Sequence, residues 1–201
     1  MNGVMINSQA KKISPEEYLK LERAAEYKSD YYDGEIHERT RCKPNHNLIA
    51  ANVMGELGMQ LKKRACFVFP SDMRIKIPAA GFYGYPDVSI VFGKGEFEGE
   101  DNLLNPTVLV EVLSENTEAF DRCKKFQFYQ QIPTLREFLF IADDHYLVEQ
   151  YIRVDNRIWR VNFLDRLQDV VKLPSLNCEL AVAEIYDKVK FHKTGAEFER
   201  V

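Results

Sequence analysis

Hydrophobic residues recur at helical spacing in a segment that begins at Asn45 or His46. The recurring positions are Leu48, Ile49, Val53, Leu57 and Leu61. Because this spacing places the side chains on one side of a helix, the pattern predicts an amphipathic helix that packs on a sheet.

Helix-boundary signals occur in two other segments. Ser14-Pro15-Glu16-Glu17 combines a capping serine, a proline in the first turn and a glutamate three residues after the cap, which predicts a helix to about Lys28. Thr117 can cap a helix that runs to Ile132, because Pro133 disfavours helical geometry at the residue before it.

Strand-like patterns fill most of the remaining chain. An Asp-Gly pair inside 31–36 predicts a hairpin turn, and residues 73–77 alternate strictly. The other expected strands are 67–69, 86–92, 107–113 and 137–142, followed by a meander at 146–154, 157–163 and 169–173. With a short helix around 181–186, the order predicts an α/β (α+β) fold: a mixed β-sheet flanked by helices, with a C-terminal β extension.

The length of 201 residues, with 45% hydrophobic and 29% charged residues, predicts one globular domain. We expect this domain to span 14–187. We expect 1–13 to be a flexible N-terminal segment and 188–201 to be a charged C-terminal tail.

No segment has the apolar length of a secretion signal or a membrane span, so the sequence predicts a cytoplasmic protein that does not bind membranes. The cysteines are scattered without a Cys-x-x-Cys pair, which favours reduced thiols. The net charge of −4 lowers the expectation of non-specific nucleic-acid coating. Local phosphodiester binding is still compatible with this charge, because metal ions can supply cationic groups.

Two acidic residues interrupt neighbouring apolar segments. Asp87 begins one expected strand, and Glu111 lies inside the next, on the same face as Leu109 and Leu113. Buried carboxylates need a cationic partner. If the two strands are adjacent, the carboxylates can meet. Together with the backbone carbonyl of Val112, they would form the oxygen site that Mg²⁺ or Mn²⁺ prefers.

The sequence around these acids is similar to a known family. Pro86-Asp87 followed by Glu111-Val112-Leu113 resembles the PD-(D/E)XK nuclease signature. The flanking segments, with Asp121, Lys125, Tyr129 and the run Ile132 to Phe138, resemble the Uma-two family (domain of unknown function 820). The resemblance extends from about Glu16 to Tyr186. It implies a restriction-endonuclease-like fold and a metal-dependent site at Asp87 and Glu111.

This chain departs from the wider signature at one position. Leu113 stands where those nucleases keep lysine. The resemblance implies that Lys125, on the following helix, takes this catalytic role, and Lys124 is the competing residue. Asp121, Lys125 and Tyr129 are spaced four apart, so an exposed ion pair on a helix is the alternative interpretation of Asp121 and Lys125. By analogy, His46, Glu35, Lys124 and Tyr129 are candidate substrate-binding residues.

The leading hypothesis is therefore a divalent-metal-dependent endonuclease that hydrolyses DNA phosphodiester bonds. The alternative is a non-catalytic nucleic-acid-binding or regulatory module on a nuclease scaffold, which the missing lysine and the acidic balance favour. A hydrolase of small phosphoesters is a third hypothesis, because one scaffold hosts several functions. An exposed sheet edge could also support a homodimer.

Overall fold

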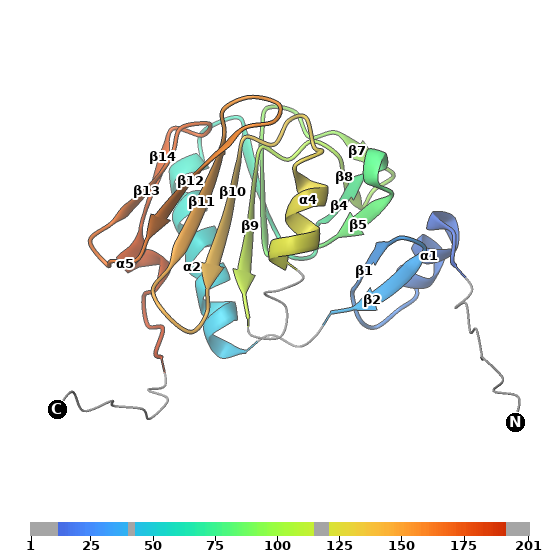
Figure 1. The fold of residues 1–201 in the computed structure, drawn as a ribbon, viewed down its shortest axis with the longest axis horizontal. Helices are drawn as coiled ribbons and strands as arrows, with labels where there is room; N and C mark the ends of the chain where they lie inside the picture. The colour runs from blue at the N-terminus through green and yellow to red at the C-terminus, as the bar shows by residue number, and fades with distance from the viewer. Residues whose placement is uncertain (1–11, 40–42, 115–120, 192–201) are drawn as a thin grey trace, which may run out of the picture.

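Two six-stranded mixed sheets form the body of the protein (Figure 1). They are seen in a computed structural model that describes residues 12–39, 43–114 and 121–191, without the side chains of 121 and 123. The central sheet has the order β12-β11-β10-β9-β6-β3, in which β9 and β10 are parallel and the other neighbours antiparallel. Its strands are β3 (Cys66–Pro70), β6 (Val88–Phe92), β9 (Val108–Leu113), β10 (Glu137–Ala142), β11 (Val148–Arg153) and β12 (Trp159–Leu164).

The second sheet has the order β2-β1-β5-β4-β8-β7. Its strands are β1 (Ser29–Tyr32), β2 (Glu35–Glu38), β4 (Arg74–Ile77), β5 (Phe82–Gly84), β7 (Phe97–Glu98) and β8 (Asn102–Leu103). The expected hairpin is the pair β1–β2, and its turn residues Asp33 and Gly34 both have positive φ, at 53° and 79°. Asp-Gly adopts this turn readily because glycine carries no Cβ.

The helices are α1 (Pro15–Glu22), α2 (Pro44–Leu61), α4 (Phe126–Tyr129) and α5 (Val182–Ile185), with a 3₁₀ turn, η1 (Pro78–Ala80), and a π-helical turn, η2 (Asp121–Lys125), directly before α4. The expectation that the first helix reaches Lys28 was wrong. The Tyr18 hydroxyl donates to Ser29 O at 2.7 Å, and Ser29 N donates to Glu22 Oε1 at 2.9 Å. These contacts turn the chain back on α1 and begin β1.

The helix expected from Thr117 to Ile132 ends earlier, at Tyr129, and Ile132 N bonds Tyr129 O in a turn. Thr117 itself lies outside the described residues. The expected meander was correct for β11 and β12. It was wrong for β13 (Val170–Leu173), which pairs with β14 (Cys178–Ala181) in a separate two-stranded sheet. Leu173, Leu176 and Leu180 from this region pack in the same core as α2, which explains why the chain leaves the central sheet.

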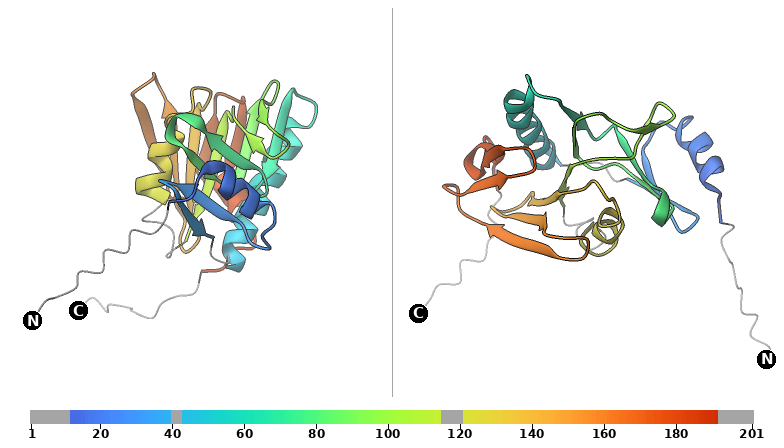
Figure 2. Two further views of the ribbon diagram at one scale, coloured as in Figure 1. Left: turned by 90° about the vertical axis from the view of Figure 1, so that its right-hand side faces the viewer. Right: turned by 90° about the horizontal axis from the view of Figure 1, so that it is seen from above.

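The two faces of the central sheet have different cores. Val108, Val110 and Val112 of β9 belong to the core that includes α2, whereas Leu109 and Leu113 belong to the core with α4 and the second sheet. Figures 1 and 2 show α2 and α4 on opposite sides of the sheet. The alternation expected for β9 is confirmed, and it directs Glu111 toward α4 and the second sheet.

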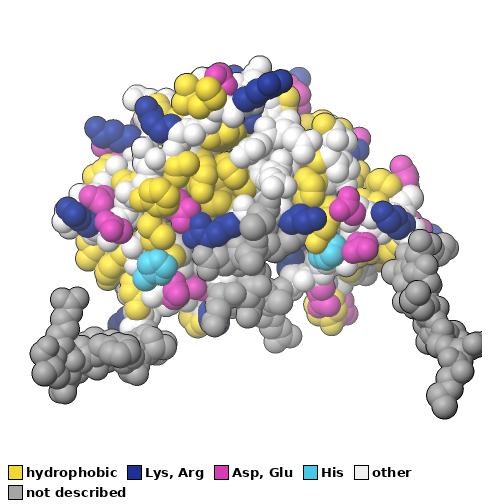
Figure 3. Space-filling model, viewed as in Figure 1, with side chains coloured by type: hydrophobic (Ala, Val, Ile, Leu, Met, Phe, Trp, Pro, Cys, Tyr) yellow, Lys and Arg dark blue, Asp and Glu magenta, His cyan; other side chains and the backbone are white. Residues whose placement is uncertain are grey.

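No helix among the described residues is long and apolar enough to cross a membrane. On the face drawn in Figure 3, acidic and basic side chains are interspersed, with hydrophobic side chains between them. Cys66 and Cys178 are not disulfide-bonded, and burial raises the pKa of both thiols.

Candidate active site

Asp87 lies directly before β6. Its two hydrogen bonds to β9 are with Val110 and Val112, the residues on either side of Glu111. Asp87 N donates to Val110 O at 3.0 Å, and Val112 N donates to Asp87 Oδ2 at 2.7 Å. The antiparallel pairing of β6 with β9, which includes Val88 opposite Val110, sets this register. The two acids singled out in the sequence therefore lie side by side on adjacent strands.

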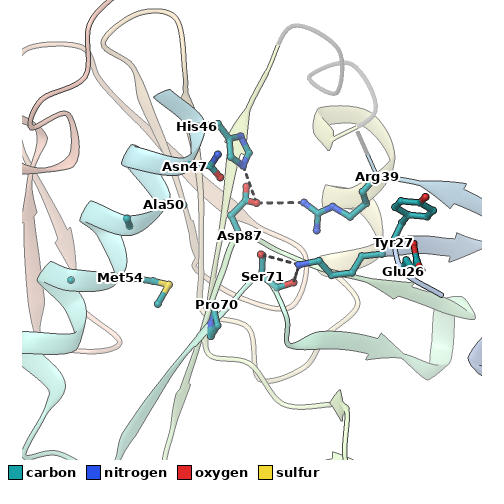
Figure 4. A pocket seen from close by; sticks show the side chains of 13 residues that line it. Glu26, Tyr27, Arg39, His46, Asn47, Ala50, Met54, Pro70, Ser71 and Asp87 are labelled. Carbon is teal, nitrogen blue, oxygen red and sulfur yellow. Dashed lines mark hydrogen bonds and ion pairs between the residues drawn. The ribbon is translucent and has the colours of Figure 1, made fainter. Parts of the chain in front are cut away.

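Cationic and hydrogen-bonding groups surround the Asp87 carboxylate. Oδ1 lies 3.1 Å from His46 Nε2, in the first turn of α2, and 3.4 Å from Arg39 Nη2 (Figure 4). The Arg39 guanidinium also donates to Tyr85 O. Burial alone would raise the pKa of Asp87, but His46, Arg39 and the Val112 N–H together bring it below the usual value. Asp87 is thus held as a carboxylate.

One residue of η2 and one of α4 contact the Glu111 carboxylate. It is only 1% exposed, and Oε1 lies 3.2 Å from Lys125 Nζ and accepts from the Tyr129 hydroxyl at 2.9 Å. Burial, with the negative charges of Glu111 and Asp30, raises the pKa of Tyr129 well above the usual value, so its hydroxyl stays a donor. π-Helical turns such as η2 are frequent at functional sites.

A third acid, Asp30 of β1, joins the two that the sequence indicated. Asp30 Oδ2 lies 3.4 Å from Lys125 Nζ, and Tyr85 N donates to Oδ1 at 3.2 Å. We call Asp30, Asp87, Glu111, Arg39 and Lys125 the acid cluster. Its three carboxylates and two cations leave one formal negative charge when His46 is neutral.

Sequence reasoning missed Asp30 and Arg39. Asp30 follows the segment wrongly expected to be helical, although an acid between strand-like residues was a usable signal. Arg39 carried no signal, because its partners come from other parts of the chain.

The other predicted residues divide into two groups. His46 and Tyr129 contact the acids directly, as described above. Glu35 is exposed and lies 3.7 Å from His37, and Lys124 is exposed with its Nζ 5.9 Å from the centre of the Tyr32 ring. Lys125, rather than Lys124, therefore contacts the acids. The structure does not describe the Asp121 side chain, so the pairing of Asp121 with Lys125 stays a prediction.

A groove of about 700 Å³ leads to this site (Figure 4). Asp87, His46 and Arg39 line one part of it, and the apolar side chain of Met54 points toward it from α2. Lys28, another lining residue, donates to Ser71 O at 3.2 Å. Asp87 and Arg39 are thus the members of the acid cluster that line the groove.

The donor set fits a hard divalent cation. Asp87 and Glu111 supply carboxylate oxygens from positions next to one another on neighbouring segments of the sheet. No group of three or more His, Cys, Asp or Glu residues is arranged for a metal within the described ranges. A metal would therefore depend on these two acids, backbone carbonyls and waters, as Mg²⁺ sites commonly do.

Comparisons with known proteins identify the family of this chain. Residues 15–183 match the Uma2 family model, described as "Putative restriction endonuclease". Uncharacterized protein sll1609 of Synechocystis sp. is 35% identical over 158 residues, covering 78% of this chain and 89% of that protein. Uncharacterized protein slr1290 of the same organism is 31% identical over 181 residues, covering 90% and 94%.

A crystal structure from Anabaena variabilis, described as a "putative nuclease belonging to DUF820", has a TM-score of 0.73 and 19% identity. The match covers 89% of this chain and 99% of that one, so the two proteins share a fold. Together with the family match over residues 15–183, these similarities show that the chain belongs to the Uma2 family of restriction-endonuclease-like proteins.

Proposed function

We propose that this protein is a divalent-metal-dependent endonuclease that hydrolyses DNA phosphodiester bonds. The observation that carries the proposal is the position of Asp87 next to Glu111. Asp87 N donates to Val110 O and Asp87 Oδ2 accepts from Val112 N, so these two hydrogen bonds flank Glu111. The contact of Lys125 with Glu111 supports it, because Lys125 would supply from another element the lysine that is absent at Leu113. The family description supports a nuclease.

Asp87, Glu111 and the Val112 carbonyl would hold Mg²⁺ or Mn²⁺. Once bound, the ion would supply Lewis acidity that activates water and offsets charge on the phosphorus centre. His46 and the Val112 N–H fix the orientation of Asp87, and the Tyr129 hydroxyl does the same for Glu111. These bonds preorganise the two carboxylates before substrate arrives.

Two cations of the acid cluster have roles toward substrate. Lys125 would position the attacking water or donate to a phosphate oxygen from beside Glu111. Arg39, which lines the groove, would bind a phosphate of the DNA backbone. Because the whole chain has a net charge of −4, substrate binding would depend on such local cations. A homodimer that cuts both strands stays a prediction.

The test is nicking of supercoiled plasmid in Mg²⁺ or Mn²⁺. Asp87→Asn and Glu111→Gln should each lower the nicking rate about a thousandfold, equivalent to roughly 4 kcal/mol in the barrier. Glu179→Gln is the matched control, because Glu179 is exposed on β14. Thermal unfolding of each variant checks the fold. Equal nicking by wild type and both acid variants would remove the assignment.

A non-catalytic nucleic-acid-binding module is the second candidate. The observation in its favour is the burial of the site: Glu111 is 1% and Lys125 4% exposed, and Glu111 Oε1 already accepts from Tyr129. DNA binding that persists in EDTA, without cleavage in either metal, would favour this candidate. Metal-dependent nicking that is lost in Glu111→Gln would exclude it.

A further inference from the structure

The two edge strands of the central sheet differ in whether another strand can pair with them. One edge is β3, which contains Pro70, a residue without a backbone N–H. Cys66 N donates to Arg64 O at 2.8 Å, and Pro70 O accepts from Met73 N at 3.0 Å. Proline and locally paired backbone groups keep an edge strand from pairing with another chain. β3 is therefore a blocked edge.

The other edge is β12, which lacks these features. Its sequence, Trp159–Leu164, contains no proline and one charged residue, Arg160. No strand in the described part of the chain pairs with β12 on the side away from β11. Val161 is 37% exposed and Phe163 67% exposed, and Ile158, directly before the strand, is 56% exposed. An open, apolar edge strand of this kind marks a surface for association.

The pairing of β12 with β11 determines which backbone groups of β12 face outward. Val154 N donates to Ile158 O at 2.8 Å in the turn that joins the two strands. Arg153 N donates instead to Arg136 O, the residue before β10. Because the bonded positions of an antiparallel pair alternate, the even-numbered residues of β12 bond to β11. The odd-numbered residues therefore direct their N–H and C=O groups to the open side.

A second copy of β12 can satisfy these groups when a two-fold axis passes beside Val161. Antiparallel pairing about this axis places Val161 opposite the partner's Val161, with all their outward N–H and C=O groups facing one another. It places Trp159 opposite the partner's Phe163, so aromatic side chains pair across the strands. Arg157 comes opposite the partner's Asp165, and both residues are exposed. The edge is thus complementary to itself in backbone, aromatic side chains and charge.

Other registers of the same pairing are less favourable. An axis beside Phe163 would place Arg160 opposite the partner's Arg166, which are like charges. An axis beside Trp159 would place half of β12 opposite the turn that precedes it, because the strand begins at this residue. Only the axis beside Val161 pairs all three outward-facing residues of the strand with one another.

We propose that β12 is the interface of a homodimer in which the central sheets of two copies join into one twelve-stranded sheet. Two antiparallel strands of one sheet are related by an axis perpendicular to that sheet, so the face with the acid cluster points the same way in both copies. The proposal does not rest on the nuclease assignment, because it uses only the backbone and side chains of the sheet edge.

Sedimentation velocity of the full chain over a range of concentrations tests the dimer. We expect a reversible increase to twice the monomer mass. Val161→Lys places two like charges next to one another at the axis and should weaken the dimer at least tenfold, equivalent to about 1.4 kcal/mol. Phe67→Lys is the matched control, because Phe67 is an exposed residue of the blocked edge β3, and it should leave the dimer unchanged. Thermal unfolding checks that both variants fold.

A charge exchange tests whether the partner is a second copy in this orientation. Arg157→Glu and Asp165→Arg each place like charges opposite one another, and each should weaken the dimer about threefold, within the range of surface ion pairs. The double variant restores opposite charges and should regain the wild-type dissociation constant. A variant that acted only by destabilising the fold would not be rescued in this way.

A disulfide cross-link tests the register. In the proposed pairing the two Val161 Cα atoms lie about 5.5 Å apart, within disulfide range, so Val161→Cys should form a covalent dimer on oxidation. Phe163→Cys should not exceed the wild-type background, because the axis separates the two copies of this residue by about 13 Å along the strand. Cross-linking through Phe163→Cys alone, an unchanged dimer in Val161→Lys, or a monomer at roughly millimolar concentration would each overturn the proposal.

Discussion

The acid cluster and a second buried polar cluster differ in how their charges balance. The second, which we call the Arg74 cluster, consists of Arg74, Glu22, Tyr85, Asp101 and Asn102, with the half-exposed Arg23 at its edge. Arg74 is 2% exposed, donates to Asn102 Oδ1 at 2.6 Å and to the Tyr85 hydroxyl at 2.9 Å, and pairs with Asp101. The Tyr85 hydroxyl donates in turn to Glu22 Oε1 at 2.8 Å.

The charges of the Arg74 cluster cancel. Arg23 pairs with Asp101 at 2.9 Å, so two arginines match the two acids Glu22 and Asp101. Among the described residues, the acid cluster has three acids for one arginine and one lysine, with His46 as a further partner of Asp87, and it borders a groove. Complete pairing between α1, β4 and β8 is what a structural role requires. A carboxylate that lines a groove, as Asp87 does, can be reached by a cation from solution, which is what a metal-dependent site requires.

Arg74→Met should produce the largest change in stability. It removes the buried partner of Asp101 and the donor to Asn102 and the Tyr85 hydroxyl, and breaking a buried charged network costs about 3–5 kcal/mol. Urea denaturation should show this loss, whereas Arg166→Met, at an exposed arginine, should change stability by less than about 0.5 kcal/mol. Equal stability of the two variants would show that the Arg74 cluster does not hold the second sheet together.

The neighbouring lysines Lys124 and Lys125 extend the comparison to nicking activity. Lys125→Met removes the ammonium beside Glu111 and Asp30, so nicking should fall about a hundredfold, the lower end of typical proton-transfer contributions. Lys124→Met changes the neighbouring exposed lysine and should stay within about twofold of wild type, which corresponds to only tenths of a kcal/mol. Plasmid nicking measures both. The reverse ranking would transfer the role to Lys124.

A smaller effect is expected at the Tyr129 hydroxyl. Tyr129→Phe removes one donor to Glu111 Oε1 but keeps the ring packing against Phe82 and Phe138. Because Lys125 still contacts the carboxylate, the free energy of unfolding should fall by only about 1 kcal/mol. Urea denaturation measures this fall. A loss as large as that in Arg74→Met would indicate that the acid cluster is mainly structural.

The last prediction concerns the pH dependence of stability in Asp87→Asn rather than the size of the stability loss. The folded pKa of Asp87 lies below its unfolded value, so its charge stabilises the fold above about pH 4 and this contribution is lost at lower pH. Wild type should exceed the variant in thermal stability near neutral pH, and the difference should shrink below about pH 4. A difference independent of pH would mean that Asp87 titrates as in the unfolded chain.

The sequence by itself determined the elements whose signals are local. The repeat of Ile49, Val53 and Leu57 specified α2, because one side of a helix must be buried. The Asp33-Gly34 turn specified the β1–β2 hairpin, and alternation in β9 separated Glu111 from its valine neighbours. The acids Asp87 and Glu111 were conspicuous because carboxylates in apolar strands need partners.

Only the tertiary structure decided which partners these acids receive. Asp30 reaches Lys125 from another sheet, and Arg39 reaches Asp87 from the segment after β2. Contacts made after folding likewise decide that α1 ends at Glu22 and that β13 pairs with β14 rather than with the central sheet. Such contacts join residues far apart in the chain, and local periodicity carries no information about them. The charge balance of the site is therefore a property of the folded arrangement.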